Sequence, residues 1–115
     1  MIAVVWQFDV REGYQDEFER FYGADGAWPA LSRKSRSFLG SSFLKDLAQP
    51  TRYFVVEYWS EMVVYERHQA DFSAEVQELD LERHRLVVSM APLGIFTALD
   101  VPDRSGPTWS QRDGR

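Results

Sequence analysis

The stretch TRYFVVEYWSEMVVYERHQADF, from Thr51 to Phe72, begins as a β-strand with large apolar side chains on both of its faces. Successive side chains of a strand point to opposite faces. One face carries Tyr53, Val55 and Trp59, interrupted only by Glu57, whereas the other carries Phe54, Val56 and Tyr58. Because neither set is typical of a strand face exposed to water, both faces of the sheet need a cover.

Three further strands are predicted around this one. Residues 2–10 alternate between large apolar and smaller or polar side chains, which is the pattern of a strand with one strongly apolar face. Residues 38–45 predict a weaker strand that pairs with residues 52–59 as a hairpin. Residues 93–99 predict the last strand, and residues 87–92 are expected to connect it to the helix before it.

Two helices are predicted between these strands. Apolar residues recur at helical spacing from Tyr14 to Tyr22, and a short helical piece is expected at residues 28–34. Residues 61–86 predict a long helix with a bend at residues 71–73, where two good capping residues interrupt it. Its apolar stripe consists of Tyr65, Phe72, Val76 and Leu79.

The order of these elements predicts an α+β, ferredoxin-like βαββαβ fold with a four-stranded antiparallel sheet. Two helices cover only one face of such a sheet, and an uncovered apolar face is larger than soluble monomers usually tolerate. We therefore expect a homodimer that packs sheet against sheet. The folded domain is expected to span residues 1–100, and residues 101–115 are expected to be a disordered tail.

Composition narrows the classes of partner. The chain has 115 residues, a net charge of -5 and no cysteine. This size predicts a single domain, and the acidic balance argues against binding to nucleic acid. No apolar run reaches the roughly 20 residues needed to cross a bilayer, so membrane insertion is not expected either. These properties fit a soluble cytoplasmic protein without disulfides or thiolate metal sites.

Several side chains are candidates for a site. Trp59 and Tyr65 could form the wall of an aromatic pocket or simply pack in the core. His68 lies roughly 50° from the centre of the apolar stripe, where it could reach a pocket as a proton acceptor or act as a boundary histidine bonded to backbone. Glu57 could be a base, although an ion pair at the subunit interface is the favoured interpretation.

Three segments resemble the antibiotic biosynthesis monooxygenase domain of the dimeric α+β barrel superfamily. They are Val5-Trp6-Gln7-Phe8, the first helix from Gly13 to Tyr22, and the spaced set Trp59-Ser60, Tyr65, His68 and Phe72. The resemblance covers about residues 1–100 and implies a dimeric α+β barrel. That superfamily contains quinone-forming oxygenases, haem-degrading enzymes and isomerases, so the resemblance alone does not fix an activity.

Two branches of the superfamily suggest site residues. The anthrone-oxidising branch has a Trp at the end of the third strand, an Asn four residues before it and a Tyr six residues after it. The corresponding positions here are Trp59, Val55 and Tyr65, so the Asn is replaced. The haem-degrading branch uses a first-strand Asn, a Trp and a helical His, and Gln7, Trp59 and His68 are similar in type.

The resemblance therefore implies a cofactor-independent monooxygenase that acts on a small aromatic or phenolic molecule between helices and sheet. The expected catalytic residues are His68, Tyr65 and Trp59, with Trp6, Phe72 and Val55 in contact with the substrate and no metal. One alternative is a non-catalytic protein of the same fold that binds a small hydrophobic molecule. The other is a relative that binds or degrades haem, with His68 as the axial ligand.

Overall fold

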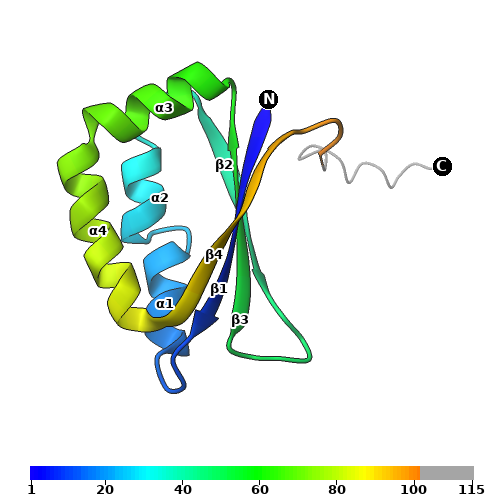
Figure 1. Ribbon diagram of the computed structural model, residues 1–115, viewed down its shortest axis with the longest axis vertical. Helices are drawn as coiled ribbons and strands as arrows, with labels where there is room; N and C mark the ends of the chain where they lie inside the picture. Colours follow the sequence, from blue (N-terminus) through cyan, green and yellow to red (C-terminus); the bar gives the residue numbers. More distant parts are fainter. Residues whose placement is uncertain (102–115) are drawn as a thin grey trace.

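In the computed structural model, which describes residues 1–101, four helices lie on one face of a four-stranded sheet (Figure 1). The strands are β1 (Ile2–Val10), β2 (Phe38–Lys45), β3 (Arg52–Trp59) and β4 (Val87–Thr97). The helices are α1 (Gln15–Tyr22), α2 (Ala27–Ser32), α3 (Met62–Asp71) and α4 (Ser73–Leu86). This arrangement confirms the predicted ferredoxin-like α+β fold. No helix within residues 1–101 is long and apolar enough to cross a membrane.

The sheet is antiparallel throughout, with the strand order β2-β3-β1-β4. β1 and β3 lie at its centre, and their register sets Val5 opposite Val56 and Trp6 opposite Val55. Side chains of directly opposite residues share a face. Val55, Glu57 and Trp59 consequently point toward the helices, as the alternation along β3 predicted.

The last strand is longer than the sequence pattern predicted. β4 already begins at Val87, opposite Val10, so residues 87–92 are strand rather than a connection. The prediction failed because Pro92 breaks the expected pattern. β4 is an edge strand, where a residue without a backbone N–H is tolerated, and its pairing with β1 shifts register twice.

The predicted bend in the long helix is a break between two helices. Phe72 has φ -111° and ψ 29°, and it lies between the end of α3 and the start of α4. Backbone hydrogen bonds nevertheless continue across it, from Phe72 N to His68 O at 3.0 Å and from Val76 N to Phe72 O at 2.8 Å. The break lets α3 and α4 follow the sheet at different angles (Figure 1).

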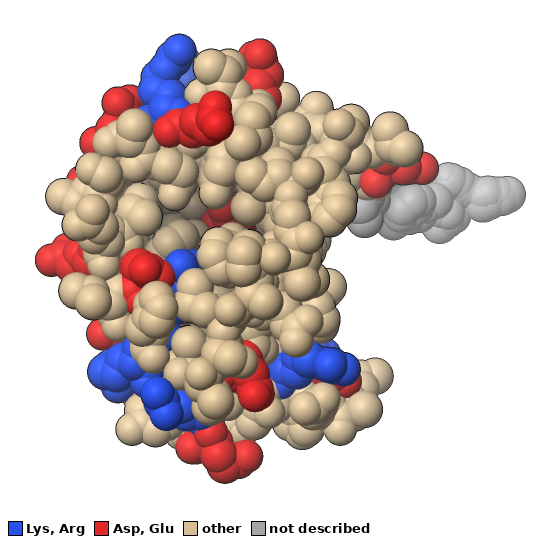
Figure 2. Space-filling model, viewed as in Figure 1, with Lys and Arg blue, Asp and Glu red and all other residues tan. Residues whose placement is uncertain are grey.

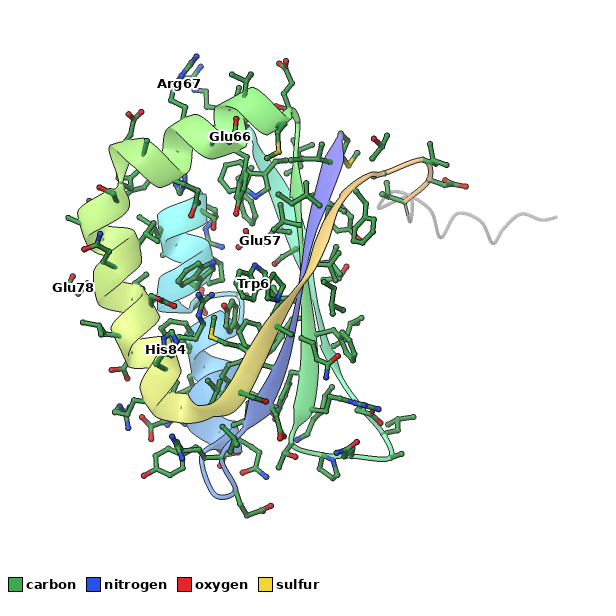
Figure 3. All side chains as sticks on the ribbon, viewed as in Figure 1. Trp6, Glu57, Glu66, Arg67, Glu78 and His84 are labelled. Carbon is green, nitrogen blue, oxygen red and sulfur yellow. The ribbon has the colours of Figure 1, made fainter. Side chains whose placement is uncertain are left out.

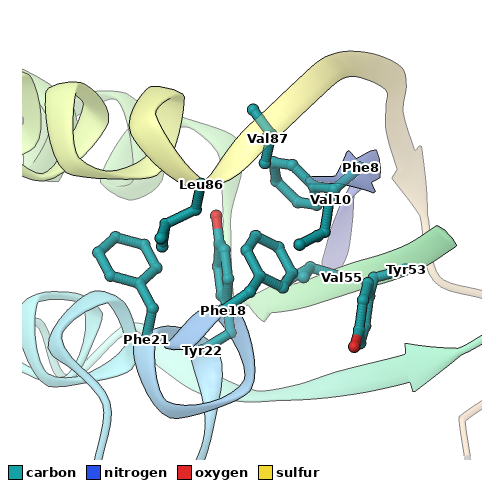
Figure 4. Close-up of a cluster of buried hydrophobic side chains, with 9 residues drawn as sticks. All are labelled: Phe8, Val10, Phe18, Phe21, Tyr22, Tyr53, Val55, Leu86 and Val87. Carbon is teal, nitrogen blue, oxygen red and sulfur yellow. The ribbon is translucent and has the colours of Figure 1, made fainter. Parts of the chain in front are cut away.

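An aromatic core holds one end of the helical layer on the sheet (Figure 4). Phe18 of α1 is fully buried, with its ring centroid 5.3 Å from that of Phe8 and 5.0 Å from that of Tyr53. Leu86 and Val87 close the cluster where α4 runs into β4. This core fixes α1 and α4 against β1 and β3, and the candidate site lies further along the same layer.

The opposite face of the sheet has no cover from residues 1–101 (Figure 1). Strand register and alternation place on this face the side chains of Ala3, Val5, Leu44, Phe54, Val56, Tyr58 and Phe96. Leu44 is 52% exposed and Phe96 is 50% exposed. The predicted tail, apart from Val101, lies outside the described residues.

Candidate functional site

A partly enclosed cavity of about 120 Å³ lies between the sheet and the helices. Its walls come from all four helices and the two central strands: Trp6, Tyr22, Trp28, Val55, Glu57, Tyr65, Gln69, Val76, Asp80 and Arg83. Figure 2 shows a hollow on this side of the molecule with acidic atoms in its depth, and in Figure 3 Trp6 and Glu57 lie between the sheet and α4. The cavity therefore combines aromatic walls with a few charged groups.

Glu57 is the buried acid of this cavity. Its side chain is only 7% exposed because β3 directs it into the helical layer. Its Oε2 accepts hydrogen bonds from Trp28 Nε1 at 2.9 Å and Ser32 Oγ at 3.3 Å, and its Oε1 accepts one from Trp59 Nε1 at 3.3 Å. Burial raises the pKa of Glu57, and these three hydrogen bonds and the charge of Arg83 oppose that rise only in part.

The expectation of an ion pair at a subunit interface was wrong for Glu57. The carboxylate points toward the helices, on the opposite side from the uncovered sheet face, and no Lys, Arg or His of residues 1–101 lies within ion-pair distance. Its partners are uncharged donors from α2 and from β3 itself. Glu57 is consequently a carboxylate without a counter-ion in direct contact.

Helix α2 places two of these donors. The turn from α1 leads into Gly26, which is buried and whose missing side chain allows close approach to the carbonyl oxygens of Arg20 and Phe21. Trp28 and Ser32 are four residues apart, so they lie on one face of the helix and reach the same carboxylate oxygen. The tight α1–α2 junction thus sets the position of Glu57's hydrogen-bond donors.

Arg83 supplies the positive charge of the cavity. The side chain of this residue is buried, and its guanidinium carbon lies 4.2 Å from the ring centroid of Trp28 and 5.1 Å from that of Trp6. Its Nη1 donates to Tyr22 Oη at 2.8 Å and its Nη2 to Asp80 Oδ1 at 2.6 Å. Arg83 Nε is buried without an acceptor among the described residues, so this N–H of the guanidinium has no hydrogen bond there.

Tyr65 contributes a neutral hydroxyl. Burial raises the pKa of Tyr65 to about 12, and the charge of Glu57 adds to that rise. The hydroxyl therefore stays protonated near neutral pH and can donate a hydrogen bond to an oxygen of a bound molecule. Its ring packs edge-on against Trp59, with centroids 5.2 Å apart.

Three of the six predicted site residues line this cavity: Tyr65, Trp6 and Val55. Trp59 does not reach it, because the indole is fully buried beneath Tyr65 and His68. Trp59 instead donates its N–H to Glu57. Trp59 is therefore in contact with Glu57 and is not part of the cavity wall.

His68 and Phe72 lie on a separate surface hollow of about 140 Å³. His68 is buried, and its Nε2 lies 2.9 Å from the carbonyl oxygen of Leu31, which can only accept, so Nε2 carries the proton. Its Nδ1 lies 3.3 Å from the amide nitrogen of Gln69. Both ring nitrogens are engaged, which agrees with the interpretation of a boundary histidine bonded to backbone.

The three residues that resemble those of the haem-degrading branch, Gln7, Trp59 and His68, do not all lie together. Gln7 lies opposite Phe54 on the uncovered face of the sheet, whereas Trp59 and His68 pack within the helical layer. Within residues 1–101, no group of three or more His, Asp and Glu side chains is placed to hold a metal ion. A larger, more open hollow of about 570 Å³ lies beside β2, but Arg33 is the single charged residue of its lining.

Sequence reasoning missed Trp28 and Arg83. Arg83 stands beside His84 and Arg85, so the run resembled a solvated helix face, although only His84 and Arg85 are exposed. Trp28 belongs to a helix of six residues, too short to show a periodic pattern. The buried carboxylate was the available signal, because a charge in a central strand requires donors from the layer that covers it.

The fold agrees with comparisons to known proteins. The family model for antibiotic biosynthesis monooxygenases matches residues 1–78. The chain therefore belongs to the antibiotic biosynthesis monooxygenase family. No curated protein is significantly similar to it in sequence.

Solved structures share the fold at low sequence identity. A variant of SnoaB, a cofactor-independent oxygenase from Streptomyces nogalater, has a TM-score of 0.68 and 20% identity, with 87% of this chain and 94% of that chain covered. A candidate antibiotic biosynthesis monooxygenase from Deinococcus radiodurans has a TM-score of 0.68 and 16% identity, with 90% and 97% covered. PA3566 from Pseudomonas aeruginosa has a TM-score of 0.59 and 16% identity, with 88% and 94% covered.

Proposed function

We propose that this protein is a cofactor-independent oxygenase of a small aromatic or phenolic molecule, which binds in the cavity between sheet and helices. The observation that carries the proposal is the composition of the cavity: aromatic walls enclose two carboxylates, a guanidinium and a protonated tyrosine hydroxyl. Flat apolar walls with a few fixed polar groups are typical of small-molecule sites. Family membership supports oxygen chemistry at this site.

The reaction needs no redox group from the protein. Removal of a proton from a phenol or an activated methylene gives an electron-rich anion that can react with O₂. For a methylene substrate, one oxygen atom becomes the new carbonyl and the other leaves as water with the two hydrogens of the carbon. All four electrons that O₂ accepts then come from the substrate. The protein supplies orientation, exclusion of water and a basic group that holds the proton.

Tyr65 and Arg83 have complementary parts in this scheme. Trp6 and Val55 bound the aromatic ring of the substrate, and the Tyr65 hydroxyl donates to its oxygen. The guanidinium of Arg83 stabilises the anion as charge develops, which is most effective in a cavity that excludes water. These roles replace the one expected of His68, whose ring nitrogens are engaged elsewhere.

Oxygen uptake with a panel of anthrone-like and hydroquinone substrates tests this function. Tyr65→Phe removes the cavity hydroxyl and is expected to lower kcat/KM at least tenfold, the usual scale for losing one hydrogen bond to developing charge. Tyr58→Phe is the matched control, because it removes a hydroxyl from the uncovered sheet face. An uptake trace that stays flat across the panel with the wild-type protein would refute catalysis.

A non-catalytic binding protein is the second candidate, and the replacement of the expected Asn by Val55 favours it. Val55 lines the cavity and offers no hydrogen bond there. The protein would be assigned this function if it bound the same panel of molecules without oxygen uptake. The larger side chain of Val55→Leu should weaken that binding. Val56→Leu makes the same change on the opposite face of β3 and is expected to leave binding unchanged.

We also propose that a second copy of the chain covers the open sheet face. Half-exposed Leu44 and Phe96 flank the strands that carry Val5, Phe54 and Val56 on this face. The same face of a second copy matches it in apolar character, as a two-fold contact requires. The cavity lies on the other side of the sheet, so each copy would keep a complete set of cavity residues.

A further inference from the structure

We propose that Glu57 is the proton acceptor of the cavity, held in place by Trp28, Ser32 and Trp59 as positioning residues. This inference deepens the proposed function, because it names the group that takes the proton from the bound molecule. The inference rests first on the burial of Glu57 in a central strand of the sheet. Among residues 1–101 it is the one buried carboxylate, and it lines the cavity.

The hydrogen bonds to Glu57 leave room for a ligand. Oε2 accepts two hydrogen bonds, from Trp28 and Ser32, whereas Oε1 accepts one, from Trp59. A carboxylate oxygen has two lone pairs, so Oε1 retains the capacity to accept another hydrogen bond. The O–H group of a molecule bound in the cavity could donate this remaining hydrogen bond to Oε1. All three protein partners are donors, so none of them competes for the proton that Glu57 would receive.

The charges around the cavity favour transfer of that proton. A carboxylate without a counter-ion in contact is costly to bury, and taking up a proton removes this cost. The phenolate formed at the same moment lies in a cavity that Arg83 also lines. The guanidinium, whose Nη2 also pairs with Asp80 Oδ1 at 2.6 Å, keeps its charge throughout. Negative charge thus moves from Glu57 to the ligand without leaving the cavity.

The proton balance is simple. The O–H bond of a phenol breaks, its electron pair stays on the phenol oxygen, and a new O–H bond forms on Glu57. No electron is transferred in this step, and O₂ takes no part in it. The step can therefore be observed without oxygen, separately from any oxygenation.

The test uses 4-nitrophenol, because its ionised form absorbs visible light and it can be titrated under nitrogen. At a pH below the pKa of the free probe, wild-type protein is expected to produce the phenolate band on binding. Glu57→Gln keeps the shape of the side chain but not the proton acceptor, so any phenolate that Arg83 stabilises in this variant must release its proton to the solvent, whereas the wild-type complex should keep that proton on Glu57. 4-Nitroanisole, which has no hydroxyl proton, controls for a spectral shift caused by burial alone.

Ser32→Ala supplies a second variant with the opposite expected sign. Ser32 is buried and donates to Oε2 without lining the cavity. Loss of that donor makes the carboxylate a stronger proton acceptor, so the phenolate fraction should rise. If Glu57 had only a structural role, Ser32→Ala would not increase the phenolate fraction of the bound probe. Circular dichroism of each variant confirms that the fold is kept.

Infrared difference spectra of the wild-type protein make the test independent of the variants. Binding of 4-nitrophenol is expected to create a protonated-carboxyl band. A wild-type complex with the phenolate band but without a protonated carboxyl, or a protonated-carboxyl band that persists in folded Glu57→Gln, would overturn the assignment of Glu57. Failure of oxygen uptake with a normal phenolate band would instead refute only the oxygenase function.

Discussion

Glu57 imposes a burial cost on the folded chain that depends on pH. Its pKa is raised above the ordinary value of 4.5, chiefly by burial, so the folded state binds its proton more tightly than the unfolded state. Stability must therefore fall as pH rises from about 4.5 through the raised pKa, because the buried carboxyl then ionises. This cost is the reverse of the usual effect of a paired surface acid.

Replacement of Glu57 by Gln should remove this pH dependence. We expect the melting temperature of Glu57→Gln, relative to wild type, to increase steadily from acidic to neutral pH. Thermal unfolding followed by circular dichroism across this range measures the difference. Glu66→Gln, at an exposed position of α3, is the control and should show no such trend. If the difference in melting temperature between Glu57→Gln and wild type stayed constant with pH, the pKa of Glu57 would not be raised by folding.

His68 provides a second prediction at this scale. Its Nε2 hydrogen bond ties α3 to the carbonyl oxygen of Leu31 in α2, and its ring packs between Trp59 and Phe72 with centroids 5.0 and 4.9 Å away. His68→Ala should lower the free energy of unfolding by about 2–3 kcal/mol through the lost hydrogen bond and packing. The exposed His84→Ala should change it by less than about 0.5 kcal/mol.

Denaturant unfolding of the two histidine variants measures these free energies. Adding haemin to the wild-type protein and to both variants tests the axial-ligand alternative in the same preparations. We expect no Soret shift that depends on His68, because its ring nitrogens already have partners. A shift that disappears only in His68→Ala would contradict this assignment.

The sequence identified part of the site because strand alternation is reliable. It placed Val55, Glu57 and Trp59 on one face of β3, and the structure confirms that face. It did not find Arg83, because a long side chain on a polar stretch of helix turns inward only when the covering layer offers partners. Asp80 is one turn away on α4 itself, whereas Tyr22 becomes a neighbour of Arg83 only when α1 and α4 meet on the sheet.

At the scale of elements, the α1–α2 junction controls the cavity. A Cβ on Gly26 would collide with the carbonyl oxygens of Arg20 and Phe21 at the end of α1. Gly26→Ala must therefore push α2 away, and with it the donors Trp28 and Ser32. We expect a loss of at least about 2 kcal/mol in the free energy of unfolding, more than a typical substitution causes.

Gly13→Ala is the control for this prediction. Gly13 has φ +89° with no atom within 4 Å of an added Cβ, so the variant suffers backbone strain without a collision. We expect Gly13→Ala to lower the free energy of unfolding by about 1 kcal/mol. Denaturant unfolding compares the two, and only Gly26→Ala should also weaken binding of 4-nitrophenol. If both variants lost the same free energy of unfolding and both still bound 4-nitrophenol normally, the α1–α2 junction would not be what positions α2.

Element boundaries could be predicted where one pattern dominated. The alternation in β1 and β3 and the spacing of aromatic residues in α1 gave strands and a helix that the structure confirms. The start of β4 could not be predicted, because its pairing depends on β1, which is far away in the sequence. Pairing along an edge strand tolerates a proline that local propensity interprets as a break.

For the whole molecule, the proposed second copy should depend on the uncovered sheet face. Val56→Lys places a charge in the middle of that face and is expected to shift the sedimentation of the protein from dimer to monomer. Val63→Lys is the matched control, because Val63 is 54% exposed on α3, in the helical layer. Sedimentation velocity at micromolar concentration measures both, and a wild-type monomer of 13.4 kDa would refute the dimer.

The general architecture followed from the order of strands and helices, whereas the cavity did not. Its volume depends on how α2, α3 and α4 are spaced over the sheet, and on aromatic side chains that stop short of filling the layer. Such spacing results from packing between distant segments rather than from any local pattern. The family resemblance predicted a pocket here, but only the structure identifies Glu57, Asp80 and Arg83 as its charged groups.

A crystal structure of the protein with 4-nitrophenol, grown without oxygen, tests the site most directly. We expect one molecule in the cavity, with its ring near Trp6 and Tyr65 and its phenol oxygen within hydrogen-bond distance of Glu57 Oε1. Ligand density in the open hollow beside β2 or on the uncovered sheet face, with the cavity empty, would contradict it.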